Sequence, residues 1–121
     1  MVELDPAHVV GTGGALGALL RTFVSTQVDI EEFPLGTFTV NIIGSFALGL
    51  FTFLSLGDSL MLLLGTGACG SFTTFSSFSF ETVRLWETGE RGRATVNAIG
   101  NLAGAGIALG VAWGVAQLVA Y

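Results

Sequence analysis

The sequence has few charged residues, one cysteine, one histidine and no lysine. Charged residues make up 11% of the 121 residues, against about 25% in soluble domains, which argues against an ordinary soluble protein. The single cysteine, Cys69, excludes an internal disulfide framework and a multi-cysteine metal site, and the single histidine, His8, excludes a histidine cluster. Nucleic acid is excluded as a partner, because 4 basic residues face 9 acidic ones.

Apolar residues and glycine are abundant in the sequence. Hydrophobic residues account for 51% of the chain and glycine occurs 18 times. The mean hydropathy is +0.76. A disordered chain needs low hydrophobicity and high charge, so disorder is excluded as well. The composition predicts a small integral membrane protein.

Polar breaks divide the chain into four apolar stretches. A helix needs about 20 apolar residues to cross a bilayer, so four spans with short loops account for the whole length. The run Leu60–Leu64 lacks the alternation of a transmembrane β-strand. We therefore predict an all-α integral membrane protein with a single membrane domain, residues 1–121. Its four transmembrane helices are expected at about 7–28, 34–56, 59–86 and 94–120.

The charges are placed unevenly along the chain. The net charge is −5, and because salt screens repulsion between acidic groups, we expect a halophilic source. The basic residues lie in or near the first and third loops, which the positive-inside rule makes cytoplasmic, with both termini outside. The acidic start of the chain predicts no cleaved signal peptide. The basic residues are all arginines: Arg21, Arg84, Arg91 and Arg93.

The third stretch is expected to contain a helix broken near mid-membrane. Glycines at 65, 67 and 70 loosen the helix, and the Ser/Thr run after them can satisfy freed backbone groups. Unwound carbonyls can bind a cation there. Phenylalanines at 72, 75 and 78 share a helical face; their ring edges can face a small anion, or the stripe serves packing or lipid contact.

This stretch carries a resemblance to a known family. Residues 70–78 (GSFTTFSSF) resemble the G-x-x-T-T-F-S-T-F signature of the Fluc (CrcB) fluoride channels. Residues 13–21 (GGALGALLR) resemble the first-helix pattern G-G-x-x-G-A-x-x-R of that family. Residues 36–46 (GTFTVNIIGSF) resemble its second-helix pattern G-T-x-x-V-N-x-x-G-x-F. The resemblance covers essentially the whole chain.

The resemblance implies a fluoride-selective channel in the cell membrane that exports toxic fluoride passively. The family forms antiparallel dimers with two fluoride pathways and a structural sodium ion at the dimer centre. By position, the backbone carbonyls of Gly70 and Thr73 would hold the sodium ion; close packing is the alternative role of Gly70. The dimer is either a homodimer or a heterodimer with a homologous subunit of opposite orientation. The one-sided arginines favour a fixed orientation and so raise the heterodimer hypothesis.

The resemblance also assigns the fluoride pathway. Phe75 and Phe78 match its paired phenylalanines, and Asn41 matches its pore asparagine; a structural interhelical bond is the alternative for Asn41. Arg21 matches a vestibule arginine that concentrates anions, with snorkelling to the interface as the alternative. Phe72 and Phe80 are expected to pack. Three further pathway candidates are the hydroxyls of Thr74 and Ser77 and, in a polar track of the fourth helix, Asn101, which shares a face with Asn97.

Two other functions stay open at the level of the sequence. One is a small four-helix transporter; a proton-coupled exporter needs a carboxylate near the bilayer centre, and the nearest, Glu81, lies past the phenylalanine stripe. The other is a non-conducting subunit of a membrane complex. The sequence argues against an enzyme, because it shows no nucleophile–base set, no metal-binding set and no phosphate-binding loop.

Overall fold

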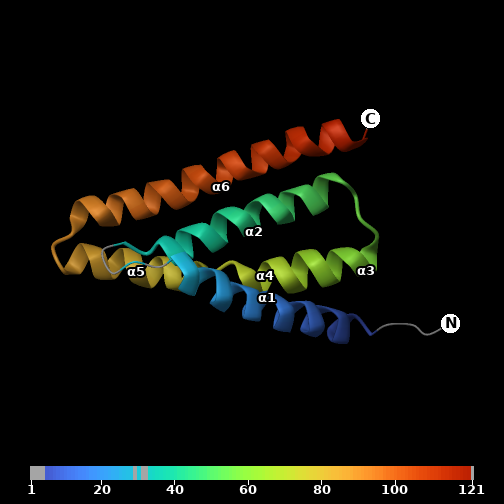
Figure 1. The fold of residues 1–121 in the computed structure, drawn as a ribbon, viewed down its shortest axis with the longest axis horizontal. Coiled ribbons are helices and arrows are strands. Elements are labelled where there is room, and N and C mark those ends of the chain that lie inside the picture. Colours follow the sequence, from blue (N-terminus) through green and yellow to red (C-terminus); the bar gives the residue numbers. More distant parts are fainter. Residues whose placement is uncertain (1–4, 29, 31–32, 121) are drawn as a thin grey trace.

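The computed structural model describes residues 5–28, 30 and 33–120, and all of its regular elements are helical (Figure 1). Within that part of the chain, the predicted all-α class is confirmed, whereas the four membrane-spanning segments stay a prediction. The expectation about a signal peptide rests on residues 1–6, of which residues 1–4 lie outside the described residues. The elements are α1 (Pro6–Val28), α2 (Leu35–Phe53), α3 (Asp58–Leu60), η1 (Met61–Cys69), α4 (Gly70–Phe72), α5 (Phe75–Glu87) and α6 (Arg91–Ala120).

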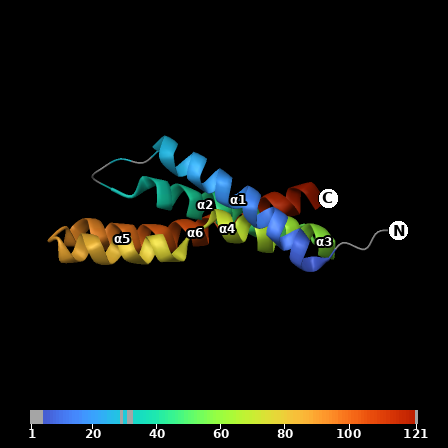
Figure 2. The ribbon, with the colours of Figure 1, turned by 90° about the horizontal axis from the view of Figure 1, so that it is seen from below.

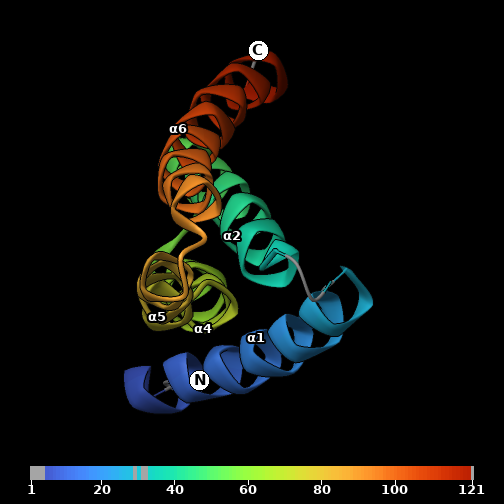
Figure 3. The same ribbon diagram turned by 90° about the vertical axis from the view of Figure 1, so that its left-hand side faces the viewer.

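Except for α1, the helices run along one long axis, and the start of α1 and the end of α6 lie at the same end of the molecule (Figure 1). This agrees with an even number of passes. Seen along the axis, α1 and α6 lie on opposite sides, with α2, α4 and α5 between them (Figure 3). The helix α1 crosses the others at an angle and packs on η1, α4 and α2, while α6 packs on α2 and α5 (Figure 2).

The burial pattern is the inverse of that in a soluble protein. The inner face of α6 carries small or polar residues, whereas large apolar side chains point outward. Small inner residues let helices approach closely in lipid, and an apolar exterior suits a bilayer. By length and composition, α2 and α6 are apolar enough to cross a membrane. The buried residues of α6 are Ala94, Asn97, Asn101, Ala108, Ala112 and Ala116; exposed ones include Val96, Ile99, Leu102, Ile107 and Leu118.

Glycines bring α1 and the third segment into backbone contact. A Cβ atom at Gly13 would overlap the carbonyl oxygen of Leu63, and one at Gly17 would overlap that of Ala68. A Cβ at Gly67 would crowd α1 in the same way. These residues are therefore glycine because the two backbones touch, which is how small residues join helices in membranes.

The third segment is broken, as predicted, but not at its glycines. Gly65 and Gly67 stay helical within η1, a π-helix of nine residues. The extended residues are Thr73 (φ −82°, ψ 160°) and Thr74 (φ −146°, ψ 116°), between α4 and α5. The expectation that glycines unwind the helix was wrong, because Gly67 serves close packing instead and the break needs partners for its freed backbone groups.

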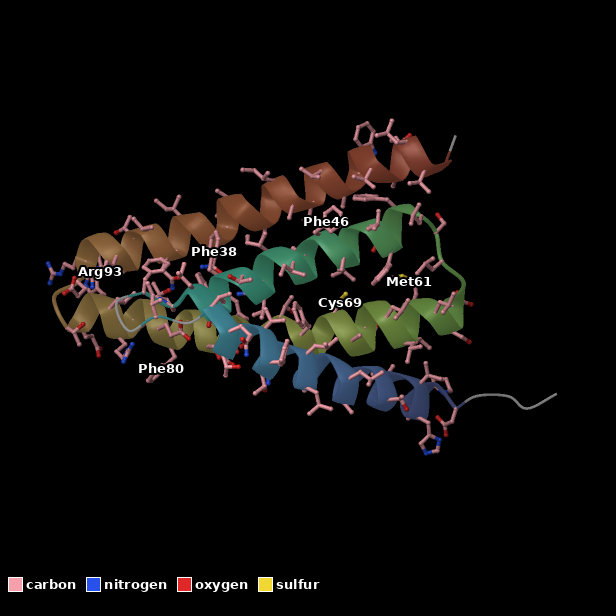
Figure 4. All side chains as sticks on the ribbon, viewed as in Figure 1. Phe38, Phe46, Met61, Cys69, Phe80 and Arg93 are labelled. Carbon is pink, nitrogen blue, oxygen red and sulfur yellow. The ribbon has the colours of Figure 1, made fainter. Side chains whose placement is uncertain are left out.

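The loop between α5 and α6 is shorter than expected. Gly89 has a positive φ of 89°, and the N–H of Glu90 donates to the carbonyl of Leu85 at 2.8 Å, which closes α5. As a result, α6 begins at Arg91 rather than near residue 94. The Arg91 guanidinium lies 4.8 Å from the centre of the Trp86 ring, and Arg93 lies at the same end of the molecule (Figure 4).

Candidate functional site

A hollow of about 550 Å³ lies beside the break, between α2, α5 and α6. Five predicted pathway residues line it, and so does Thr73, a predicted sodium ligand. Ser77, Arg21 and Gly70 are not among its lining residues. Apolar side chains such as Leu48 and Leu102 complete the wall. The five pathway residues are Asn41, Thr74, Phe75, Phe78 and Asn101.

Asn41 holds the broken backbone. Its side-chain oxygen accepts the Thr74 N–H at 2.7 Å, and its amide nitrogen donates to the Thr74 carbonyl at 3.1 Å. The amide therefore takes the place of a missing helical turn, since a buried peptide group without a partner is costly. One side chain of α2 thus fixes the point at which the third segment stops and restarts.

The hydroxyl of Thr74 starts the helix that carries the rings. Its Oγ1 accepts the N–H of Ser77 at 3.2 Å, which is a helix N-cap, and lies 3.5 Å from the hydroxyl of Ser76. Ser77 was predicted as a hydroxyl donor to an anion. In the structure, the backbone N–H of Ser77 donates to the N-cap hydroxyl of Thr74.

Phe75 and Phe78 stand one turn apart at the start of α5. Their ring centres are 5.9 Å apart and the ring planes are tilted by 45°. Phe78 is half-buried beside the hollow, whereas Phe75 is 80% exposed. Both rings therefore line the hollow, and the Phe75 ring stands at its open edge, where few other side chains of the chain contact it.

Polar side chains of α6 continue inward from Asn41. Asn41 donates to the side-chain oxygen of Asn101 at 3.3 Å, and Asn101 donates to the side-chain oxygen of Asn97 at 3.1 Å. Asn97 is fully buried and donates to the hydroxyl of Thr82 on α5 at 2.8 Å. The predicted shared face of Asn97 and Asn101 is confirmed. Thr82 was missed because a threonine in an amphipathic helix gives no sequence signal by itself.

A second polar contact joins α2 to α5 about one turn after Phe78 along α5. The hydroxyl of Thr37, a buried residue, donates to a carboxylate oxygen of Glu81 at 2.8 Å. Glu81 lies past Phe78 along α5, as expected, and is half-buried. Thr37 stands in the second-helix motif, so its place in that motif was the available signal. Polar contacts thus tie α5 to both neighbouring helices.

The carbonyls near the break suit a hard cation. The N–H of Thr74 donates to Asn41 rather than to the Gly70 carbonyl, which a continued helix would give it. Gly70 is exposed at the surface of the chain, and Thr73 is half-buried. Hard cations bind oxygen ligands, so both carbonyls fit sodium chemically. In the described part of the chain, no group of three or more acidic, His or Cys side chains could hold a metal.

Two predicted residues lie apart from the hollow. Arg21 is half-buried and lies on α1, seven residues before that helix ends at Val28. Phe80 is 69% exposed and points away from the helix pair α2 and α6 (Figure 4). The expected packing of Phe80 is therefore not seen within the chain. Phe72 does pack, since a Cβ atom at Gly44 would lie 3.2 Å from its ring.

Comparison with known proteins gives consistent matches over nearly the whole chain. Residues 8–115 match the family described as CrcB-like protein, Camphor Resistance (CrcB). The chain is 59% identical over 119 residues to the fluoride-specific ion channel FluC 2 of Haloarcula marismortui, covering 98% of this chain and 100% of that protein. It is 49% identical over 108 residues to FluC 1 of Halobacterium salinarum, covering 89% and 91%. It is 42% identical over 111 residues to FluC of Ruminiclostridium cellulolyticum, covering 85% of each.

Proposed function

Because the chain belongs to the CrcB family, we propose that it is a fluoride-selective ion channel that exports fluoride passively across the cell membrane. The family consists of fluoride channels rather than enzymes, so no residue is assigned a catalytic role. The observation that carries the proposal is the hollow at the helix break, where Asn41, Thr74 and Phe78 meet.

Side chains at and beside the break are proposed to accept a small anion without trapping it. Fluoride holds its water tightly, so a pathway must offer donors in place of that water. The hydroxyls of Thr74 and Ser77 are proposed as donors, and the ring edges of Phe75 and Phe78 carry partial positive charge. None of these groups carries a full positive charge, so the anion can leave again. Asn41 and Asn101 shape the route.

Passive flow is sufficient to remove fluoride. Hydrogen fluoride enters a cell uncharged from acidic surroundings and dissociates at neutral pH, which traps the anion inside. The membrane potential then drives the anion out through an open path, at about 2.3 kcal/mol per charge for each 100 mV. At the mouth of the route, Arg21 is proposed to concentrate anions electrostatically.

A second subunit is proposed to complete the pathway. The hollow is bordered by Phe75, an aromatic side chain left 80% exposed within the chain. We expect an antiparallel dimer with two pathways, in which the partner covers this face. The partner is a second copy or a homologous subunit of opposite orientation; arginines gathered at one end favour the latter.

A structural sodium ion is proposed at the dimer centre. The backbone carbonyls of Gly70 and Thr73 would hold it, since Thr73 lies at the break and Gly70, one turn earlier, is exposed at the surface of the chain. When bound, the ion supplies a fixed positive charge that joins the two subunits. The arginine-rich end is assigned to the cytoplasm, with both termini outside, in a multi-pass cell-membrane protein.

The test is fluoride efflux from liposomes that contain the purified chain alone, with chloride efflux as the control. Fast fluoride-selective efflux would establish the channel and show that one sequence builds a working homodimer. If well-folded protein gives no efflux, the homologous partner is added. Efflux only then would identify a heterodimer, whereas continued silence would overturn the channel in favour of a transporter or a non-conducting subunit.

A further inference from the structure

The polar contacts around the rings form one unidirectional chain of hydrogen bonds. Each member donates to the next, so the bonds polarise one another in the same direction. The chain begins at a backbone N–H just before α5, passes through α2 and α6, and returns to a backbone carbonyl one turn further along α5. We call it the relay. Its bonds run from Thr74 N–H to Asn41 Oδ1 (2.7 Å), Asn41 Nδ2 to Asn101 Oδ1 (3.3 Å), Asn101 Nδ2 to Asn97 Oδ1 (3.1 Å), Asn97 Nδ2 to Thr82 Oγ1 (2.8 Å), and Thr82 Oγ1 to Phe78 C=O (2.8 Å).

The two backbone ends determine the orientation of every amide between them. A backbone N–H only donates and a carbonyl only accepts, so Asn41 must present its oxygen to the N–H of Thr74. At the other end, Thr82 donates to the Phe78 carbonyl and therefore accepts from Asn97. The direction of the relay follows from these fixed ends.

The side-chain amides of the relay donate their hydrogens to other groups of the protein. The Asn41 nitrogen donates to the Thr74 carbonyl and to Asn101, and the Asn101 nitrogen donates to two oxygens of Asn97. Asn97 is 0% exposed and does not line the hollow. These side chains are therefore arranged to hold the protein, and Asn97 lies out of reach of an ion in the hollow.

The relay begins at the residue before the ring pair and ends at the second residue of the pair. Thr74 precedes Phe75, and the carbonyl at the other end belongs to Phe78 itself. Asn97 makes a hydrogen-bonded junction between α6 and α5. A side chain that fixes this junction fixes where the turn carrying both rings lies against the hollow.

We propose that Asn97 is a positioning residue that sets the placement of the Phe75–Phe78 turn through Thr82, and thereby the preference of the pathway for fluoride over chloride. The proposal rests on the proposed channel function. According to this proposal, a buried side chain outside the hollow affects selectivity. A residue that only joined two helices would affect stability alone.

The test compares Asn97→Ala, Thr82→Val and the double variant in liposomes, under the conditions in which the wild type conducts. Thr82→Val keeps the shape of the side chain and removes the hydroxyl, while Thr82→Ser keeps the hydroxyl and serves as the rescue. Thr95→Val is the matched control, because Thr95 also bonds to its own helix, through the Arg91 carbonyl, but is exposed and outside the relay. Fluoride and chloride efflux and the unfolding temperature are measured for each.

We expect Asn97→Ala and Thr82→Val each to lower the ratio of fluoride to chloride permeability about tenfold, which equals about 1.4 kcal/mol. Because both break the same relay, the double variant should fall no further than either single one. Thr82→Ser should keep the ratio within about twofold of wild type, since the hydroxyl bond remains, and Thr95→Val should leave it unchanged.

Several results would overturn the proposal. An unchanged permeability ratio in Asn97→Ala, with a lower unfolding temperature, would leave Asn97 a structural role only. A changed ratio in Asn97→Ala but not in Thr82→Val would show that Asn97 acts without Thr82. If Asn97→Ala does not fold, the Thr82→Val and Thr82→Ser pair decides the question alone. If the wild type itself gives no fluoride efflux, the proposed channel function is rejected. This outcome differs from one in which the wild type conducts and the variants keep its permeability ratio, which rejects the role of the relay.

Discussion

Asn41 shows how one side chain can replace a turn of helix. It pairs with both backbone groups of Thr74, so the break costs the third segment no unsatisfied hydrogen bond at that residue. The sequence singled out Asn41 by its motif and left two roles open, an anion contact or an interhelical bond. The structure shows the interhelical bond; an amide whose hydrogens are engaged in this way shapes the hollow.

Replacing Asn41 with leucine should destabilise the protein by about 1–3 kcal/mol, because the N–H and carbonyl of Thr74 lose their partner. Unfolding followed by circular dichroism in detergent measures this. Ile42→Leu, a volume-conserving change at the neighbouring position, is the control and should cost less than about 1.5 kcal/mol. Equal losses in the two variants would show that the bonds to Thr74 contribute nothing.

Replacing Phe78 with leucine should lower fluoride efflux about tenfold while the protein stays folded, since an apolar side chain remains but the ring edge is lost. Phe80→Leu is the control: Phe80 lies on the same helix but points away from the hollow, so fluoride efflux should not change. If both variants conduct like the wild type, ring edges do not line the route.

At the scale of elements, the hydropathy pattern predicted the helices well and their inner contacts poorly. The ranges near 7–28 and 94–120 agree with α1 and α6 to within a turn. The π-helix η1 and the break at Thr73 could not be read from the sequence. Both have partners far along the chain: η1 lies against the backbone of α1, and Asn41 pairs with the backbone at the break.

The contact between α1 and η1 should respond sharply to one added methyl group. Gly17→Ala places a Cβ against the Ala68 carbonyl, so the backbones must separate and the unfolding temperature should fall. Gly14→Ala, on the same helix, has nothing within 4 Å and should be neutral or stabilising, by up to about 1 kcal/mol of helix propensity. Thermal unfolding of the two variants, each compared with wild type, measures this. Similar effects of both changes would contradict a backbone contact at Gly17.

At the scale of the whole molecule, charge and shape have separate consequences. Composition was sufficient to indicate a membrane protein, and the inverted burial pattern agrees with it. The hollow could not be predicted in shape, because its walls come from α2, α5 and α6, and residues such as Asn97 and Thr82 meet only after folding. Motif matches located its lining residues from Asn41 to Ser45 and from Thr73 to Phe78, whereas the rest of the lining and the hydrogen bonds behind it required the structure.

The excess of acidic over basic residues should make the protein depend on salt. With a net charge of −5, self-repulsion is strong in dilute buffer and is screened at about 1 M salt, where the Debye length is about 3 Å. We expect a higher unfolding temperature in molar KCl than in dilute KCl, with the same result in NaCl. A protein indifferent to salt would argue against a halophilic source, and a gain only in NaCl would indicate specific sodium binding.

The relay has one further consequence, which concerns acid. Its members are amides, hydroxyls and backbone groups, none of which gains or loses a proton over the pH range in which cells live. A brace built from carboxylates or histidines would loosen as its surroundings acidify. Hydrogen fluoride enters cells fastest from acidic surroundings, so export is needed most at low pH. Low pH is also the condition under which hydrogen bonds to carboxylates or histidines change most. A frame of asparagine and threonine keeps its shape under those conditions.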